Sequence, residues 1–355
     1  MEAIPLHRIA IVLPFVNFLS EIGAPVERGI RQAGLPVSAL DNANNHVPSQ
    51  RFWAFAGSMA HSEGIEDLGY RVGEKYGANC ADPHLASLLC QAPTLYDALV
   101  QASNLINRST SRGHTGLYTR PNSEQVLFIH RPSFSANHPY ISQIDWFGIM
   151  AQLGMVRLFT GPQWLPDEIG TTVRHEPCDY IQQQLAGTRI RIAQPCSYIA
   201  LDSTQLALPP LNQSKSIPAS MQLDALPSDF VASLRQALRA YLQESDLSIE
   251  FAAELCNTSK RSLQRQLSDA GTSYSEVIDR ARFDVASDLL QNTDMQITKL
   301  SHQLGYCDSS HFSRAFRRVS GISPRKYRQL YSHCLLYTSP SPRDQRPNLV
   351  CRRLR

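Results

Sequence analysis

Two short stretches in the last third of the chain carry hydroxyl, amide and cationic side chains at the spacing of an exposed helix face. The residues that would lie on these two faces are Lys260, Arg261, Gln264, Arg265, Ser309, Ser310, Ser313, Arg314 and Arg317. Gln can pair with adenine and Arg with guanine through two hydrogen bonds, and Ser, Lys and Arg also bind phosphate oxygens. The chemistry that this set supports is contact with the base edges and backbone of duplex DNA.

The second of the two sets, which runs from Ser309 to Arg317, needs a helix that follows a tight turn. Ile297, Leu300 and Leu304 recur at helical spacing, and Gly305 follows where the chain must turn with a positive φ. Asp308 is the expected N-cap of the next helix. The expected buried side of that helix consists of Phe312, Ala315, Phe316 and Val319. A solvated basic helix is the alternative interpretation, and the preceding turn and cap favour DNA contact.

About fifty residues upstream, the same arrangement is repeated with different residues. The expected apolar face of its first helix consists of Ile249, Ala252, Ala253 and Leu255. Asn257 occupies the turn, since asparagine tolerates the left-handed region better than most residues, and Ser259 is the expected N-cap. Leu263 and Leu267 would point inward. Two helix-turn-helix motifs are therefore expected, at 248–267 and 297–328.

Between these motifs, residues 274–290 predict one long helix. Its expected apolar stripe consists of Val277, Ile278, Ala281, Val285, Ala286 and Leu289. A helix of this length spans roughly 25 Å, whereas helices that enter successive major grooves on one face of B-DNA lie about 34 Å apart. We therefore expect that simultaneous contact by both motifs would bend the DNA.

The segment 229–331 resembles the DNA-binding domain of AraC/XylS-type bacterial transcription regulators. The resemblance rests on the stretches AELCNTSKRSLQRQL, RFDVASDLL and LGYCDSSHFSRAFRRVSGISPRKYR, in the order and spacing of that family. It implies an all-α domain with two helix-turn-helix motifs joined by a long helix, and it places DNA-facing positions on all the residues of the two sets except Arg317. Asn257 stands where many members have glycine, and Lys260 where many have proline.

The first 208 residues predict an α+β domain. Helices are expected at 4–23, 49–64, 94–109 and 140–161, where apolar residues recur at helical spacing. Strands are expected at 114–120, 124–132, 170–177, 188–193 and 197–202, the first two as a hairpin. Residues 209–228 mix Pro, Ser, Asn and Gln without a period and predict a linker.

This N-terminal domain resembles the arabinose-binding-like module found in many such regulators. The stretches GYRVGEKYG, PTLYDALVQASNLIN and AGTRIRIAQPCSYIALDSTQLALPPLNQ carry this second resemblance. It implies a sensor and dimerisation domain that binds a small-molecule effector, and it does not fix the pocket residues. The candidates for a pocket lining are Tyr118, Phe128, His130, Trp146 and Trp164. Plain core packing is the alternative for each of them.

The sequence indicates no catalytic, metal or cofactor site. A metal or proton-transfer set would have to come from the histidines of the N-terminal region, and none of these has an i, i+4 partner on an expected helix: His61, His84, His114, His130, His138 and His175. Eight cysteines show no paired spacing, and we expect them to be reduced and mostly buried. The chain also lacks a GxSxG elbow, a phosphate-binding glycine loop and a dinucleotide fingerprint. We therefore expect neither an enzyme nor a cofactor.

The formal charge of +3 is distributed unevenly. Residues 1–226 carry 15 Lys and Arg against 18 Asp and Glu, residues 227–333 carry 14 against 12, and residues 334–355 carry 5 against 1. The DNA-binding segment is only mildly basic, so stable occupancy should need specific contacts or a second protomer. Residues 332–355 show no period, and we interpret them as a disordered or artefactual tail. A basic tail that grips DNA is the alternative.

Together with the two resemblances, these patterns predict a cytoplasmic, nucleoid-associated bacterial regulator. We find no run of eighteen apolar residues and no signal-peptide core, so no membrane contact is expected. The expected partners are promoter or operator DNA at two adjacent major grooves, a small effector, a second copy of the chain and RNA polymerase. The alternatives are an architectural protein that bends DNA without a ligand, and an enzyme whose site is not visible in the sequence.

Overall fold

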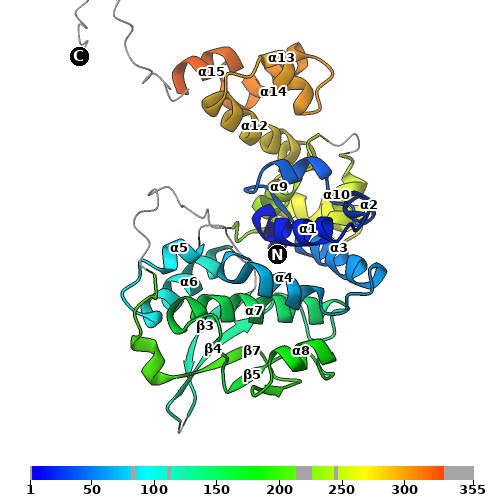
Figure 1. Ribbon diagram of the computed structural model, residues 1–355. Coiled ribbons are helices and arrows are strands. Elements are labelled where there is room, and N and C mark those ends of the chain that lie inside the picture. Colours follow the sequence, from blue (N-terminus) through cyan, green and yellow to red (C-terminus); the bar gives the residue numbers. More distant parts are fainter. Residues whose placement is uncertain are drawn as a thin grey trace, which may run out of the picture. The chain divides into compact units, whose positions relative to one another are not determined.

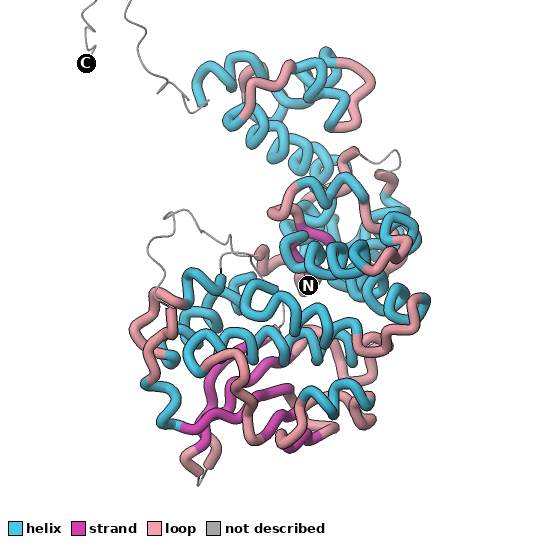
Figure 2. Tube along the Cα trace, viewed as in Figure 1, coloured by secondary structure: helices cyan, strands magenta, loops and turns pink. Residues whose placement is uncertain are grey.

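The computed structural model describes residues 2–80, 85–109, 113–121, 123–212, 226–243 and 247–331. The chain divides into two compact units, Met1–Ala281 and Arg282–Arg355. Figure 2 shows helices in both units, and all strands of the described residues belong to the first. The expected linker at 209–228 lies mainly outside the described residues, and the expected tail at 332–355 lies entirely outside them.

A five-stranded sheet forms one side of the first unit. Its strands, in spatial order, are β3 (His114–Thr119), β4 (Gln125–Arg131), β7 (Ser197–Asp202), β5 (Glu168–Gly170) and β6 (Arg189–Arg191). All neighbours are antiparallel except β5 and β6, which are parallel. The expected hairpin of β3 and β4 and the expected strands near β6 and β7 are confirmed.

The strand expected at 170–177 was wrong, because β5 ends at Gly170. The Thr171 backbone N–H still donates to the Arg191 carbonyl of β6 at 2.9 Å, but the side chains of Thr171 and Thr172 turn toward a buried carboxylate. Thr172 donates its backbone N–H to Asp145 Oδ2 at 2.7 Å, and the Thr171 hydroxyl donates to the same oxygen at 2.9 Å. A buried carboxylate needs such donors, and Thr171 and Thr172 supply them where a regular strand was expected.

Helix α7 (Ile141–Thr160) lies across the sheet, with α6 (Leu95–Ser109) and α4 (Leu68–Tyr76) beside it (Figure 1). Gly69 permits the closest approach of α4 to α7, because a Cβ atom there would lie 2.2 Å from the carbonyl oxygen of Gln143. The helices expected at 49–64, 94–109 and 140–161 are confirmed as α3 (Ser49–Ser62), α6 and α7.

The helix expected at 4–23 begins later than expected. Its first residues form strand β1 (Leu6–Arg8), which pairs with β2 (His46–Pro48), and α1 covers Ile9–Glu21. Because the partner strand lies 40 residues downstream, the local pattern of residues 4–8 could not indicate β1. The remaining short elements of this region are α2 (Val26–Gln32), η1 (Val37–Asp41), η2 (Gly77–Cys80), α5 (Leu85–Leu89), α8 (Asp179–Gln184) and η3 (Ser203–Ala207).

The described residues after 226 form helices only. In the first unit they are α9 (Phe230–Arg239), α10 (Ile249–Leu255) and α11 (Lys260–Asp269), and in the second they are α13 (Ile297–Gln303), α14 (Ser309–Ser320) and α15 (Pro324–Tyr331). Helix α12 (Tyr274–Asn292) contains the boundary between the units and confirms the expected long helix. Its buried apolar stripe differs from the expected one at three positions, since Leu290 is buried whereas Val285 and Leu289 are half-buried. The fold is thus an α+β region followed by an all-helical region.

Candidate nucleic-acid interface

The turn of the first helix-turn-helix motif has the geometry that the sequence predicted. Asn257 adopts a φ of 51° between α10 and α11, in the left-handed region that asparagine tolerates. The Ser259 hydroxyl accepts a hydrogen bond from the Ser262 backbone N–H at 3.1 Å and so caps α11. Leu263 and Leu267 are buried and anchor the inner face of the helix.

The outer face of α11 carries the four residues predicted to contact DNA, and all four are exposed: Lys260, Arg261, Gln264 and Arg265. One of them has a partner that the sequence analysis missed. Lys260 Nζ lies 2.6 Å from Glu250 Oε1, on the preceding helix. The hydrogen bond from Lys260 lowers the pKa of the Glu250 carboxyl. Phosphate contact by Lys260 must therefore compete with this exposed ion pair.

The second motif repeats this local geometry with a different turn residue. Gly305 follows α13 with a φ of 74°. Asp308 then accepts hydrogen bonds from the backbone N–H groups of Ser310 and His311, both at 2.8 Å, and so caps α14. The bond from His311 is the main reason why the pKa of Asp308 lies below its usual value. The turn and the cap predicted for this motif are confirmed.

Helix α14 is anchored by an aromatic cluster. Phe312 and Phe316 are buried as predicted, whereas Ala315 and Val319 are only half-buried, which corrects the expected buried face. The ring centroid of Phe316 lies 5.0 Å from that of Phe283 on α12 and 5.3 Å from that of Tyr327 on α15. Both partners come from outside α14, so the spacing within that helix could not reveal them.

A cation–π contact supports the turn of the second motif. The Arg282 guanidinium carbon lies 4.7 Å from the ring centroid of Tyr306, which follows Gly305. Tyr306 also packs against Phe312 with a centroid distance of 5.6 Å. The long helix α12 therefore holds the turn as well as joining the two motifs.

The outward residues of α14 differ in their freedom to contact DNA. Ser310, Arg314 and Arg317 are exposed, whereas Ser309 and Ser313 are half-buried. The Ser313 hydroxyl donates to the Ser309 backbone carbonyl at 2.7 Å, so its proton is already used within the helix. Ser313 can then contact DNA as an acceptor, whereas Arg314 and Arg317 are exposed and carry donors only.

The N-terminal domain contains a cavity, and His130 is the one aromatic pocket candidate that lines it. Phe128 and Trp146 are buried in the core, Trp164 is half-buried, and the Tyr118 side chain is 55% exposed. His130 lines that cavity together with His7 and Trp53, which the sequence analysis did not single out. The latter two sit in ordinary apolar surroundings along the chain, so no local signal marked them. His84 lies outside the described residues.

The described residues contain no group of three or more His, Cys, Asp or Glu side chains that could hold a metal ion. Across the same ranges, no helix is long and apolar enough to cross a membrane. The expectation that the cysteines are mostly buried was wrong for those with a described environment. Cys90, Cys178, Cys196 and Cys256 are half-buried and Cys307 is exposed, all with free thiols.

Two protein families match the chain. Residues 23–210 match the arabinose-binding domain of AraC transcription regulator at its N-terminus, and residues 251–330 match a helix-turn-helix domain. The first match alone covers more than half of the 355 residues.

Similar proteins include regulators from Pseudomonas aeruginosa. Its ornithine utilization regulator is 30% identical over 194 residues, which are 51% of this chain and 56% of that protein. Its regulator VqsM is 30% identical over 128 residues, 35% of this chain and 39% of VqsM. The chain thus spans about half the length of the curated relatives it matches. The crystal structure of CdpR from the same organism covers 77% of this chain and 91% of its own, with 23% identity and a TM-score of 0.34. On the strength of the family match over residues 23–210, the chain belongs to the AraC family of transcription regulators, with an arabinose-binding-like N-terminal domain.

Proposed function

We propose that this protein is a sequence-specific DNA-binding transcription regulator whose operator affinity changes when a small effector binds to its N-terminal domain. The observation that carries the proposal is the pair of capped helices α11 and α14. Each follows a left-handed turn residue, each buries one apolar face, and each exposes cationic and amide or hydroxyl side chains on the other. This is the arrangement by which helix-turn-helix proteins place a helix in the major groove.

We assign the DNA contacts to the residues predicted from the sequence. Gln264, Arg265 and Arg314 are the proposed base-reading residues, because their side chains can form paired hydrogen bonds with a base edge. The proposed phosphate contacts come from the other members of the two faces: Lys260, Arg261, Ser309, Ser310, Ser313 and Arg317. Both motifs belong to a proposed DNA-binding domain at 229–331, which follows a sensor domain at 1–208 and a linker at 209–228.

Contacts within the first compact unit support a route from the N-terminal domain to the first motif. The strand pair β1–β2 contacts α9, the first helix of the proposed DNA-binding domain. The Ile4 backbone N–H donates to Ser233 Oγ at 2.9 Å, and Gln236 Nε2 lies 2.9 Å from His46 Nδ1. The Tyr241 hydroxyl also donates to the Gly34 carbonyl at 3.1 Å.

An effector changes operator affinity only if it binds two arrangements of the protein with different affinities. Strand β1 and the residues before it provide a place for that difference, because His7 of β1 lines a cavity of the N-terminal domain and Ile4, two residues before β1, is hydrogen-bonded to α9. We therefore propose that effector binding alters the contact between β1–β2 and α9. Gln236→Ala should change operator affinity in the absence of effector, whereas the exposed Gln183→Ala on α8 should leave it unchanged.

Family membership also leads us to propose a homodimer formed through the N-terminal domain, contact with RNA polymerase at the promoter, and a cytoplasmic, nucleoid-associated location. A dimer agrees with the mild charge of the DNA-binding segment, since two protomers double the number of phosphate contacts. Analytical ultracentrifugation of the full chain tests the dimer directly, and a monomer at micromolar concentration would contradict it.

The regulator function is tested by selection from a random duplex DNA library with the full chain at moderate salt. We expect enrichment of a site with two contact blocks about one helical turn apart. Arg265→Ala should relax the preference in one block only, and Arg314→Ala in the other. Retention of DNA with no enriched sequence would contradict the proposal and favour an architectural DNA-bending protein.

A further inference from the structure

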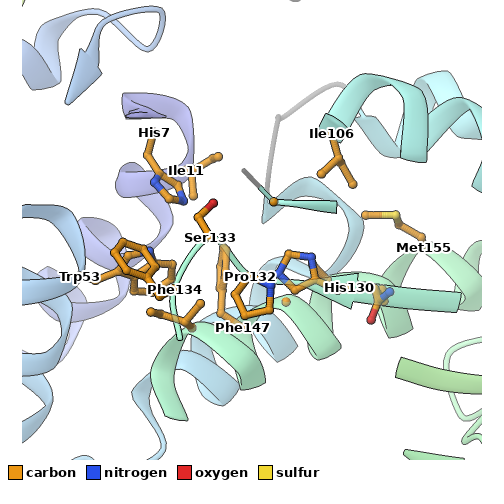
Figure 3. A pocket seen from close by; sticks show the side chains of 15 residues that line it. His7, Ile11, Trp53, Ile106, His130, Pro132, Ser133, Phe134, Phe147 and Met155 are labelled. Atoms are coloured by element: carbon orange, nitrogen blue, oxygen red, sulfur yellow. The ribbon is translucent and has the colours of Figure 1, made fainter. Parts of the chain in front are cut away.

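The N-terminal domain contains a cavity of about 100 Å³. Its wall comes from β1, α1, α3, α6, β4 with the residues that follow it, and α7, as Figure 3 shows for the labelled side chains. Elements far apart in the sequence therefore meet around this space. An engineered cavity of roughly 150 Å³ in another protein admits benzene. The present cavity has about two-thirds of that volume, so a single six-membered ring is the upper limit on the ligand.

The cavity wall carries no formal charge at neutral pH. Its fifteen lining residues include no Asp, Glu, Lys or Arg. Two are histidines, and burial lowers the pKa of His7 to about 4 and also lowers that of His130. Both imidazoles are therefore neutral near pH 7. Burying an ionised ligand group without an opposite charge is strongly unfavourable, so the wall selects against anions and cations.

Most of the wall is aromatic or aliphatic. Trp53 and Phe147 form one side, with ring centroids 6.0 Å apart, and Phe134 lies beside them in Figure 3. The aliphatic part consists of Ile11, Ile106, Ile144, Ala151 and Met155. Aromatic pairs prefer edge-to-face or offset contacts, which a flat ring among these side chains can provide. The wall has too few polar groups to satisfy the hydroxyls of a sugar.

A small number of polar atoms remain for a ligand. His7 Nδ1 lies 2.5 Å from Ser49 Oγ and His130 Nδ1 lies 3.3 Å from Thr115 Oγ1, so the Nε2 atom is the remaining polar atom of each ring. Two further lining residues, Trp53 and Gln152, are almost fully buried. Within the described residues, Trp53 Nε1 and Gln152 Oε1 have no hydrogen-bond partner. Both atoms lie beneath the cavity surface, so the hydrogen bond of a ligand is assigned to the two imidazoles.

We propose that this cavity binds an uncharged, single-ring alcohol or phenol, with its ring against Trp53 and Phe147 and its hydroxyl hydrogen-bonded to an imidazole of His7 or His130. A hydroxyl fits because it both donates and accepts, and a neutral imidazole offers one donor and one acceptor. The inference rests on the proposed effector-responsive function and names the chemical class of the effector. It assigns no role to amino acids or sugars.

The first test measures binding to the full chain without DNA, by isothermal titration calorimetry at pH 7.5. The probes are 4-methylphenol and benzyl alcohol, with benzoate and benzylamine as charged compounds of similar size, and L-ornithine and L-arabinose as polar compounds. We expect at least about tenfold tighter binding of an uncharged ring than of either charged ring, which is about 1.4 kcal/mol. Equal or tighter binding of benzoate or benzylamine, or no binding of either uncharged ring, would overturn the proposal.

Substitutions in the wall test whether the bound ring lies in this cavity. Ala151→Met adds a long apolar side chain to the wall and should abolish binding of the uncharged ring. If that variant does not fold, Trp53→Phe replaces it, because this change shrinks one of the two rings against which the ligand packs. Trp53→Phe should weaken binding several-fold. The half-buried Trp164, which does not line the cavity, provides the matched control Trp164→Phe, which should bind as the unchanged protein does.

The two proposals fail in distinguishable ways. Unchanged binding by folded Ala151→Met, or equal effects of Trp53→Phe and Trp164→Phe, overturns the cavity assignment whatever the DNA selection shows. Binding at the cavity without any change in operator affinity supports the assignment and contradicts the effector function. Operator affinity is measured by fluorescence anisotropy with and without the bound ring.

Discussion

The two helix-turn-helix motifs reach the same local backbone geometry with different side chains. The first turns at Asn257, anchors α11 through leucines and caps it with a hydroxyl. The second turns at Gly305, anchors α14 through an aromatic cluster and caps it with a carboxylate. We infer from this comparison that the motif requires a left-handed turn residue, one buried face and one cap. Any side chain that meets each requirement is acceptable.

The motifs also differ in the charge near their outer faces. On α11, Lys260 is paired with Glu250 of the neighbouring helix. On α14, Asp308 is turned toward backbone N–H groups, and Arg314 and Arg317 are exposed. We therefore expect the second motif to contribute more to phosphate attraction. The first should contribute more to base selection, through Gln264 and Arg265.

The turn residue gives the largest expected effect. Gly305→Val forces a β-branched side chain to a φ of 74° and should cost roughly 1–3 kcal/mol or more, so the second motif should unfold and DNA binding should be lost. Gly305→Asn is the matched control, because Asn257 occupies the same place in the first motif at a φ of 51°. Thermal unfolding and anisotropy measure both effects. Equal stability of the valine and asparagine variants would contradict the shared-turn argument.

Removal of a proposed base-reading arginine should have the next largest effect. Arg314→Ala and Arg265→Ala should each cost about 1–3 kcal/mol in binding to the selected site while leaving the unfolding midpoint unchanged, because both side chains are exposed. Competition with single-base variants of the site shows whether base preference is lost. If binding weakens equally on every sequence, the residue contacts phosphate and its assignment as a base reader is wrong.

The sequence predicted those parts of the motifs that follow local rules. A positive-φ residue, a capping side chain and leucines at helical spacing are all encoded within a few neighbouring positions, and Asn257, Gly305, Ser259 and Asp308 have the predicted geometry. The exposed outer faces follow from the same spacing. Whether the residues on them contact DNA stays a prediction.

The parts that were missed depend on contacts between distant segments. Strand β1 forms because β2 pairs with it, and the residues that follow β5 bind Asp145 of α7. Phe283 joins the aromatic cluster from another helix. The cavity of the N-terminal domain needs six separate elements to meet, and so His7 and Trp53 had no pattern of their own along the chain.

The two caps should respond differently to acid, and this effect is smaller than those of the turn or the arginines. The pKa of Asp308 is lowered in the folded protein, so its cap is fully present above the usual carboxyl value near 3.8 and is lost as the pH falls through the lowered value. The Ser259 hydroxyl does not titrate in this range. In the full chain labelled with 15N serine, the Ser310 amide should titrate below pH 3.8 and the Ser262 amide should not. Titration of both amides would indicate general acid unfolding.

Release of Lys260 should have the smallest effect. Glu250→Gln removes its exposed partner, so the ammonium becomes free to contact phosphate, and we expect a few-fold gain in affinity on every sequence with a steeper salt dependence. Glu254→Gln is the matched control, since it removes the same charge from α10, where Glu254 lies 3.9 Å from Arg51 and not beside Lys260. If both variants gain equally, the effect is the general loss of negative charge near DNA. A gain confined to Glu250→Gln would show that the ion pair itself limits phosphate contact by the first motif.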